Sequence, residues 1–438
     1  MDVCGSHDWE QQAARKRPAV VVGKPVVKAR RITGGIGGAH VVVSATPKAK
    51  ACASPMMKRP AASVVQRPAG VHQGAENGGG LRLGTDFGGL DTPLLALKKM
   101  GYAVKHVFNC ENNLSCIKMS TKITSPDCCV RYKDITTRNN DDVPKVDLYC
   151  AGIPCLTWAQ GGNQEGVDGD TGGLWFNAID YITKRTPKAV VLECAPTLLT
   201  QKKFEANRRQ FVNMIESAGY EVFITNIRTD EHGLPQTRVR FYLVAIKLTA
   251  KRRTFTWPTP LTHTVPVNKI IMGNKVTTLK GMLPDHQREK DHVLAALRSA
   301  ASCGVELKTS RIIVDIGGTS QFAHYTVDEF PTITATRAVS FAFWVADLGR
   351  RVTLDELMLL QGFDPAMFEG RKEAKVTDAR LAHMVGNAMS CNVLERLLPC
   401  VLDSIGITPD VVKPDRWDIL VRRSNPVVPM MSRVRWQI

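Results

Sequence analysis

Residues 81–93 read LRLGTDFGGLDTP, and this stretch decides the fold. Its first half alternates apolar and small or polar side chains and then meets Gly88 and Gly89, which is typical of a strand followed by a tight turn. Pro93 stands near the start of a helical pattern that continues to Met100. Glycines between a first strand and a helix let the backbone approach a cofactor closely. The stretch therefore predicts the beginning of an α/β domain with a ligand site at this turn.

Strand and helix patterns alternate further along the chain. Apolar runs predict strands at residues 103–109, 146–151, 189–192, 220–227 and 239–246. Periodic patterns predict helices at residues 204–218, 354–361 and 391–401. Repeated strand–helix units of this kind predict an open α/β sheet with helices on both faces.

Three segments differ from this pattern. Residues 1–78 are rich in Ala, Val, Lys, Arg, Pro and Gly, with almost no aromatic side chains, which predicts a mostly disordered basic tail. Such a tail fits a nuclear address, a DNA-binding arm, an organelle transit peptide or an inert extension. Residues 248–340 show little periodicity and predict a smaller, irregular domain, and residues 406–438 predict a basic C-terminal tail.

Composition sets further limits. The net charge of +17 over 438 residues favours polyanionic partners, although a protein that is merely basic fits the charge as well. The 12 cysteines form no Cys-x-x-Cys pair and no Cys/His set at zinc spacing, so we expect no structural zinc and a reducing compartment. No apolar run approaches the roughly 18–20 residues that span a membrane.

Acidic residues follow the next two chain reversals after the glycine turn. Glu111 lies about 20 residues beyond that turn, at the expected end of the second strand, where a carboxylate can hold ribose hydroxyls. Asp134 and Ile135 follow another reversal and could contact an adenine. These positions predict a cofactor that contains adenosine, with NAD still open at this point.

Cys155 is the candidate nucleophile. It follows a buried strand directly, at the edge of the sheet where α/β folds place ligands, and Pro154 fixes its approach. The glycine-rich segment behind it, residues 161–173, is a candidate lid. Cys150 lies inside the strand, where a cysteine usually serves as a small buried hydrophobe.

Glu193, Arg238 and Arg240 complete the candidate site. A glutamate that closes an apolar strand is expensive to bury without a partner or a task. Arg238 and Arg240 alternate along a strand and share one face. Two arginines exposed on the surface of an edge strand would give the same sequence pattern. A thiol, a carboxyl group and a cation are the groups needed for addition to cytosine C6, because that addition develops charge near N3 and O2 of the ring.

The order of these segments resembles the DNA (cytosine-5) methyltransferase family over roughly residues 82–402. Each motif alone is modest, but six of them in the family order are a specific signal. They are Phe87-Gly88-Gly89-Leu90, Gly152-Ile153-Pro154-Cys155, Glu193-Cys194-Ala195, Gln236-Thr237-Arg238-Val239-Arg240, the stretch 351–363, and Gly386-Asn387 with Val393.

The resemblance implies a fold, a cofactor and a substrate. The fold would be a Rossmann-like S-adenosylmethionine-dependent methyltransferase domain, formed by residues 79–247 and 341–405, with residues 248–340 as the target-recognition domain. The substrate would be a cytosine flipped out of double-stranded DNA. The cysteine spacing and the lack of a long apolar run predict no metal and no membrane, and we expect a monomer. The basic tail favours the nucleus, with an organelle or a bacterial cytoplasm as alternatives.

It also implies residue roles. Cys155 would attack C6 of the base, and Glu193 would hydrogen-bond N3 and the amino group. Arg238 and Arg240 would contact the base, Glu193 or a phosphate. The resemblance does not assign which arginine makes which contact. The cofactor site would be lined by Phe87, Gly89, Leu90, Glu111, Asp134, Ile135, Pro154, Leu174 and Asn387.

Several positions depart from the family pattern. Leu156 replaces the family's Gln after the nucleophile, Ala159 a later Ser, and Cys194 the Asn after the glutamate. Asp91-Thr92 stands where the glycine turn usually continues with Gly-Gly, and Asn112 replaces a common Trp. None of these changes removes a residue that performs the chemistry, so we expect an active enzyme. An RNA cytosine-5 methyltransferase and a catalytically weak nucleic-acid-binding chromatin protein are the alternatives.

Overall fold

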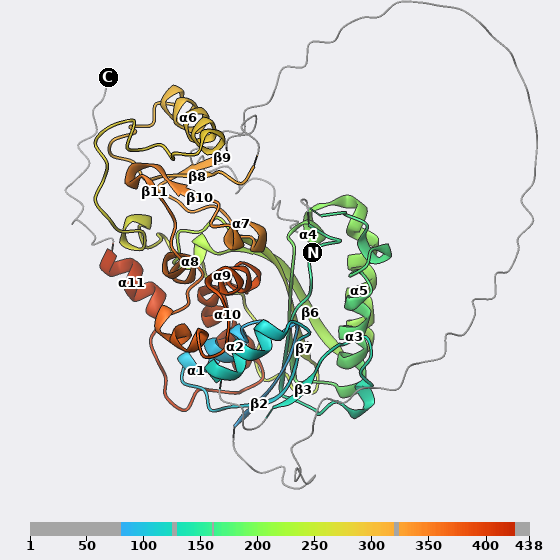
Figure 1. The fold of residues 1–438 in the computed structure, drawn as a ribbon. Coiled ribbons are helices and arrows are strands. Elements are labelled where there is room, and N and C mark those ends of the chain that lie inside the picture. Colours follow the sequence, from blue (N-terminus) through green and yellow to red (C-terminus); the bar gives the residue numbers. More distant parts are fainter. Residues whose placement is uncertain (1–79, 125–128, 160–161, 319–323, 425–438) are drawn as a thin grey trace, which may run out of the picture. The chain divides into compact units, whose positions relative to one another are not determined.

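The computed structural model describes residues 80–124, 129–159, 162–318 and 324–424 (Figure 1). The predicted N-terminal tail, residues 1–78, lies outside the described residues. None of the described helices is long and apolar enough to cross a membrane.

A seven-stranded sheet forms the centre of the larger domain, in the order β3-β2-β1-β4-β5-β7-β6. The parallel strands are β1 (Leu81–Asp86), β2 (Val104–Cys110), β3 (Val130–Tyr132), β4 (Leu148–Gly152) and β5 (Ala189–Cys194). Strand β7 (Val239–Lys247) lies antiparallel between β5 and β6 (Tyr220–Arg228). The strand order reverses between β1 and β4, which is where α/β sheets bind ligands. The expected α/β fold is confirmed.

Helices cover both faces of this sheet (Figure 1). One face packs on α3 (Leu174–Arg185), α4 (Thr197–Thr200) and α5 (Glu205–Ser217), and the other on α1 (Thr92–Lys99) and α10 (Cys391–Ser404). Along β5, Val190 and Leu192 join the first core while Ala189 and Val191 join the second. This alternation explains why the run is apolar throughout, since both sides of a covered strand are buried.

A third apolar core joins the late part of the chain to the early part. It contains α2 (Leu114–Thr124), α7 (Ala335–Val339), α8 (Leu354–Leu360) and α9 (Asp378–Asn387). Thr353 begins α8 with a capping box, in which its side chain and that of Glu356 satisfy each other's backbone N–H groups. Leu90 is buried in this core, so the loop after β1 is fixed from the C-terminal side of the sequence.

The segment predicted to form a smaller domain is more regular than its composition indicates. It contains α6 (Gln287–Ser302) and a sheet in the order β11-β10-β8-β9. Its strands are β8 (Ile312–Asp315), β9 (His324–Val327), β10 (Phe343–Val345) and β11 (Arg350–Arg351). The last two begin beyond residue 340, the predicted end of this domain. They join the sheet because β10 pairs antiparallel with β8 and covers its edge, and β11 pairs antiparallel with β10.

Residues 406–424 differ from the predicted C-terminal tail, because they end in a packed helix, α11 (Arg416–Ser424). The buried indole of Trp417 donates a hydrogen bond to Glu395, 2.9 Å away. Arg416 pairs with the same carboxylate at 2.6 and 2.7 Å. The buried Glu395 carboxylate in α10 therefore anchors this segment to the rest of the fold. The basic composition of the segment gives no sign of that attachment. Short 3-10 helices complete the secondary structure at Asn140–Asp142, Gly166–Asp168, Lys202–Phe204, Asp230–His232, Val267–Lys269, Ala346–Leu348 and Pro365–Arg371.

Candidate active site

The turn after β1 has the backbone shape that its glycines predict. Gly89 has φ +54°, and Phe87 adopts φ +53° although it is not glycine. The Gly89 N–H donates a hydrogen bond to Oε2 of Glu111, 2.8 Å away, and the Asn113 N–H donates to Oε1 at the same distance. Glu111 thus lies beside the glycine turn, as expected for a carboxylate that holds a ribose.

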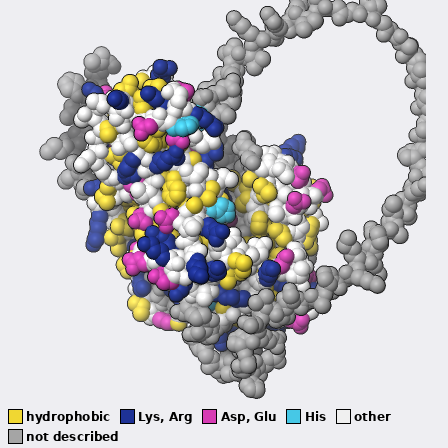
Figure 2. Space-filling view, viewed as in Figure 1, with side chains coloured by type: hydrophobic (Ala, Val, Ile, Leu, Met, Phe, Trp, Pro, Cys, Tyr) yellow, Lys and Arg dark blue, Asp and Glu magenta, His cyan; other side chains and the backbone are white. Residues whose placement is uncertain are grey.

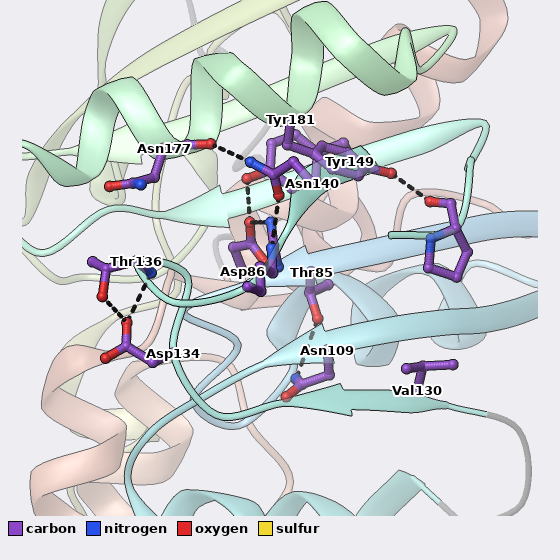
Figure 3. A network of polar contacts seen from close by, with 12 residues as sticks. Thr85, Asp86, Asn109, Val130, Asp134, Thr136, Asn140, Tyr149, Asn177 and Tyr181 are labelled. Carbon is purple, nitrogen blue, oxygen red and sulfur yellow. Dashed lines mark hydrogen bonds and ion pairs between the residues drawn. The ribbon is translucent and has the colours of Figure 1, made fainter. Parts of the chain in front are cut away.

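The other predicted cofactor residues lie along the same edge of the sheet. Asp134 follows β3, and its Oδ1 accepts hydrogen bonds from the N–H and the hydroxyl of Thr136, both 2.8 Å long (Figure 3). Ile135 is buried in the core beneath it. Pro154 follows β4 and is half-buried, Leu174 begins α3, and Asn387 ends α9 with an exposed side chain.

These groups suit an adenosine-containing sulfonium cofactor. Carboxylates beside two successive strand ends can accept from ribose hydroxyls and an adenine amino group, and Gly152 keeps the backbone open. A Cβ on Gly152 would lie 3.1 Å from Met389 and 3.9 Å from the carbonyl oxygen of Phe87, so a side chain there would crowd the edge. Among the described residues, no group of three His, Cys, Asp or Glu side chains could hold a metal ion.

Cys155 stands at the end of β4, where the strand passes into a tight turn. The Ile153 N–H donates to the Glu193 carbonyl oxygen at 2.9 Å, which continues the β4–β5 ladder by one residue. The Cys155 thiol is partly exposed and donates to the Ile153 carbonyl at 3.5 Å. The next side chain, Leu156, is 57% exposed. Cys155 therefore packs against the core on this face of the sheet while its thiol stays partly exposed.

Cys194 occupies the place of the family's asparagine and is fully buried. Burial, above all, raises the pKa of its thiol well above the usual range, and the neighbouring Cys155 thiol adds to the rise. Cys194 therefore stays a neutral thiol and packs as a small hydrophobe beside Cys155.

Glu193 is brought beside Cys155 by strand register. It pairs with Gly152 on β4 and with Tyr242 on β7, and only 4% of its surface is exposed. Burial raises the pKa of its carboxyl group, while Arg240 and Arg238 act in the opposite direction. The Arg240 Nε atom lies 3.2 Å from the Glu193 Oε1 atom. The Glu193 carboxyl group is thus buried beside the cation of Arg240, at the end of β5.

The two arginines of the Gln-x-Arg-x-Arg motif have different surroundings, a distinction that the sequence left open. Arg238 is buried and donates to the carbonyl oxygens of Ile333 at 2.8 Å, Gly386 at 3.1 Å and Ala388 at 2.9 Å. Burial, first of all, and then the neighbouring Arg240 lower the pKa of Arg238 to about 9. Arg238 thus holds the late chain against β7, whereas Arg240 faces Glu193.

Gln236, which the sequence analysis gave no role, belongs to the same junction. Its amide nitrogen donates to the Leu360 carbonyl and to the Gln361 side chain, both at 2.9 Å. Its amide oxygen accepts from the Ile333 N–H at 3.1 Å. An amide that satisfies donors and acceptors on two distant segments gives no periodic signal, so the sequence pattern alone could not assign it this role.

Asp91 explains one departure from the family pattern. It adopts φ +55°, a conformation that favours glycine but that Asp tolerates, and it is completely buried. Its Oδ1 accepts from the Thr85 hydroxyl at 3.0 Å and from the Asn109 amide at 2.7 Å. His106 lies 2.9 Å from the same hydroxyl. Polar side chains beneath the glycine turn thus occupy the space that a glycine would leave open.

The fold and this edge define an S-adenosylmethionine-dependent methyltransferase. The chain belongs to the C-5 cytosine-specific DNA methylase family, which matches residues 85–401. It is 28% identical over 265 residues to the Type II methyltransferase M.NgoBI of Neisseria gonorrhoeae, a match that covers 60% of this chain and 76% of that protein.

Two further comparisons agree. The chain is 32% identical over 164 residues to the Type II methyltransferase M1.ScrFI of Lactococcus lactis subsp. cremoris, covering 36% of this chain and 42% of that one. The fold is similar to that of the Entamoeba histolytica methyltransferase EhMeth, with a TM-score of 0.53 at 13% identity over 75% of this chain and 99% of the other.

The substitution Asp91→Asn tests the buried cluster under the glycine turn. Burial raises the pKa of Asp91 from 3.8 to about 6, against the opposing hydrogen bonds of Thr85 and Asn109. The folded state therefore binds this proton more tightly than the unfolded state, and ionisation costs stability as the pH rises through about 6. We expect the unfolding free energy of the variant, relative to the unsubstituted protein, to increase by about 3 kcal/mol between pH 4 and 7.

Urea unfolding at a series of pH values measures this difference. A difference that stays constant or decreases with pH would contradict the assignment.

Proposed function

We propose that this chain transfers a methyl group from S-adenosylmethionine to C5 of cytosine in double-stranded DNA, through a covalent adduct of Cys155 with C6 of a flipped base. The observation that carries the proposal is the convergence of a partly exposed thiol, a buried carboxyl group and a cation at adjacent strand ends. Glu193 is paired in register with Gly152, three residues before Cys155, and lies 3.2 Å from Arg240.

Cys155 would act as the nucleophile. Its thiolate adds to C6, and the electron pair of the C5–C6 double bond moves into the ring toward N3, so that C5 becomes nucleophilic. Glu193 would hydrogen-bond N3 and the amino group and stabilise the developing charge; its raised pKa suits a group that holds a proton there. Once C5 carries the methyl group, loss of the C5 proton and departure of Cys155 restore the aromatic ring.

Arg240 would keep Glu193 in place and lie near O2 of the base, whereas Arg238 would act as a positioning residue. Its three carbonyl partners include Gly386 and Ala388, which flank Asn387 at the end of α9. Arg238 would thereby hold a cofactor residue from far along the chain against the central sheet.

When bound, S-adenosylmethionine supplies an activated methyl group. Glu111 would hold its ribose, and Asp134 with Ile135 its adenine. Phe87, Gly89, Leu90, Pro154, Leu174 and Asn387 would line the rest of the site. Leu90 is buried in the core, so it would contribute through its backbone.

Residues 248–340 would recognise the target sequence, together with the strands that follow them. Extrusion of the base costs a few kcal/mol, which contacts to the DNA backbone must offset. The face seen in Figure 2 carries many Lys and Arg side chains, over the small domain and over the central part of the molecule. The curated relatives above are bacterial, so they lend no support to a nuclear address, which stays a prediction from the basic tail.

Transfer of labelled methyl groups to duplex DNA and to RNA, side by side, tests the activity. We expect label in DNA and none in RNA, and Cys155→Ser should reduce incorporation by at least about 10⁴-fold because the covalent step is lost. Cys150→Ser is the matched control: Cys150 lies inside β4 and faces the opposite core.

Label found only in RNA would favour the RNA methyltransferase. Absence of label in both, with the cofactor bound, would favour a non-catalytic binding protein. Appreciable turnover by Cys155→Ser would exclude that residue as the nucleophile.

The two motif arginines should differ when each is replaced by alanine. Arg238→Ala removes the donor from the buried carbonyl groups of Ile333 and Gly386, whereas that of Ala388 still accepts from the Gln361 amide, so we expect a loss of about 2 kcal/mol or more in unfolding free energy. Arg240→Ala should cost less stability, because its partner Glu193 can take up a proton, but should lower kcat by about 10²-fold. Chemical denaturation and steady-state kinetics measure the two effects. Equal losses of stability with unchanged kcat in Arg240→Ala would contradict the division of roles.

Removal of residues 1–78 tests the basic segment. We expect weaker DNA binding and a shallower dependence of log affinity on log salt concentration, because fewer phosphates are neutralised, with kcat preserved. Binding measured between about 50 and 200 mM salt gives the slope. Loss of cofactor binding in the shortened protein would show that the predicted boundary at residue 79 is misplaced.

A further inference from the structure

A buried ion pair lies directly beside the proposed cofactor edge, outside every motif of the family resemblance. Asp86 is the last residue of β1, immediately before the glycine turn. Its two carboxylate oxygens accept hydrogen bonds from the two terminal nitrogens of Arg138, at 2.5 and 2.6 Å. The two side chains are 0% and 2% exposed. A fully buried charge pair is costly to desolvate, so its presence calls for a role beyond stability.

Asp86 and Arg138 come from the ends of two strands that are not neighbours in the sheet. Arg138 belongs to the turn after β3, only four residues beyond Asp134. Strand β2 lies between β3 and β1, so the guanidinium group must reach across one strand to meet Asp86. The pair therefore sets the distance between the turn proposed to hold adenine and the turn proposed to approach the rest of the cofactor.

The surroundings of Arg138 hold its planar group in one orientation. The rings of Phe108, Tyr132 and Tyr181 have their centroids 5.4, 5.4 and 5.5 Å from its central carbon atom. Tyr149 donates a further hydrogen bond to Asp86, 2.5 Å long. Burial alone would lower the pKa of Arg138, but Asp86 raises it, so the guanidinium stays charged. Arginine suits this place because its rigid, planar fork matches a carboxylate and stacks on aromatic rings.

The Arg138 guanidinium also connects to α3, the third segment of the proposed cofactor edge, through the side chain of Asn140. Its Nε–H donates to the Asn140 side chain at 2.9 Å. The Asn140 amide donates to Asp180 at 2.9 Å and to the Asn177 carbonyl at 3.2 Å, both in α3 (Figure 3). Helix α3 begins with Leu174, another proposed cofactor residue. Arg138 thus connects all three segments, although it has no place in the reaction.

We propose that Arg138, paired with Asp86, is a positioning residue that fixes the adenine-side turn relative to the glycine turn and thereby sets the affinity for the cofactor. This inference rests on the proposed function of the edge as the S-adenosylmethionine site. Arg138 contacts neither Cys155 nor Glu193 in any hydrogen bond or ion pair among the described residues. Its loss therefore weakens cofactor binding and leaves the chemical step at saturating cofactor unchanged.

Titration calorimetry of the full chain with S-adenosylhomocysteine, without DNA, tests this inference. Arg138→Lys retains the positive charge but loses the bidentate fork. We expect its Kd to rise by about tenfold or more, since small displacements of positioning groups have large effects. In methyl-transfer assays the KM for S-adenosylmethionine should rise in parallel, with kcat within about twofold of the unsubstituted enzyme.

Tyr149→Phe provides a second, milder test that does not depend on the folding of the lysine variant. It keeps the ring and removes one donor to Asp86, so we expect Kd to rise by about two- to fivefold. Arg185→Lys is the matched control: Arg185 lies at the end of α3 and donates to the Asp141 carbonyl, but it pairs with no carboxylate in the described residues. Its Kd should not change.

The outcomes separate this inference from the function on which it rests. Unsubstituted protein that fails to bind S-adenosylhomocysteine would overturn the proposed cofactor site and this inference with it. Normal binding by the unsubstituted protein and an unchanged Kd in both Arg138→Lys and Tyr149→Phe would overturn the inference alone, whatever happens to their melting temperatures. A fall in kcat with an unchanged KM would also overturn it.

Discussion

The guanidinium group of Arg238 is the interaction on which the arrangement of the site depends. It joins β7 to carbonyl groups that lie 95 to 150 residues later in the chain, and it does so inside the protein, where an unpaired charge is very unfavourable. Gln236 reinforces the same junction two residues earlier. The buried donors of Arg238 and Gln236 cannot hydrogen-bond water, so they need acceptors within the protein. These acceptors belong to the late part of the chain, which is therefore held against the central sheet. Gly386 and Ala388, which flank Asn387, are held at this junction as a consequence.

The candidate chemistry depends on a second constraint, the register between β4 and β5. The Gly152–Glu193 pairing sets a carboxyl group beside the thiol-bearing turn, and a one-residue slip would turn Glu193 to the opposite face. Burial raises the pKa of Glu193, and Arg240 opposes the rise. The departure at Cys194 leaves this geometry intact, because a buried thiol fills the space as a small apolar group.

Much of the fold was predictable from the sequence because buried strands and amphipathic helices leave periodic signals. The strands β1, β4, β5 and β7 and the helices α5, α8 and α10 lie where those signals indicate. The antiparallel insertion of β7 between β5 and β6 was not predictable, since an apolar run does not reveal its neighbours. The same holds for α11, whose attachment through Trp417 depends on a carboxylate in another helix.

For the site, the sequence by itself determined the chemical groups and their order along the chain: the glycine turn, Cys155, Glu193 and the two arginines. Only the tertiary structure decided their division of labour, assigning Arg238 to carbonyl groups and Arg240 to the side of Glu193. It alone revealed the pairing of Asp86 with Arg138, 52 residues apart. The reason is physical: residue type and local spacing fix what a side chain can bind, but the partner of a buried charge is fixed by which strand ends come together in the folded sheet.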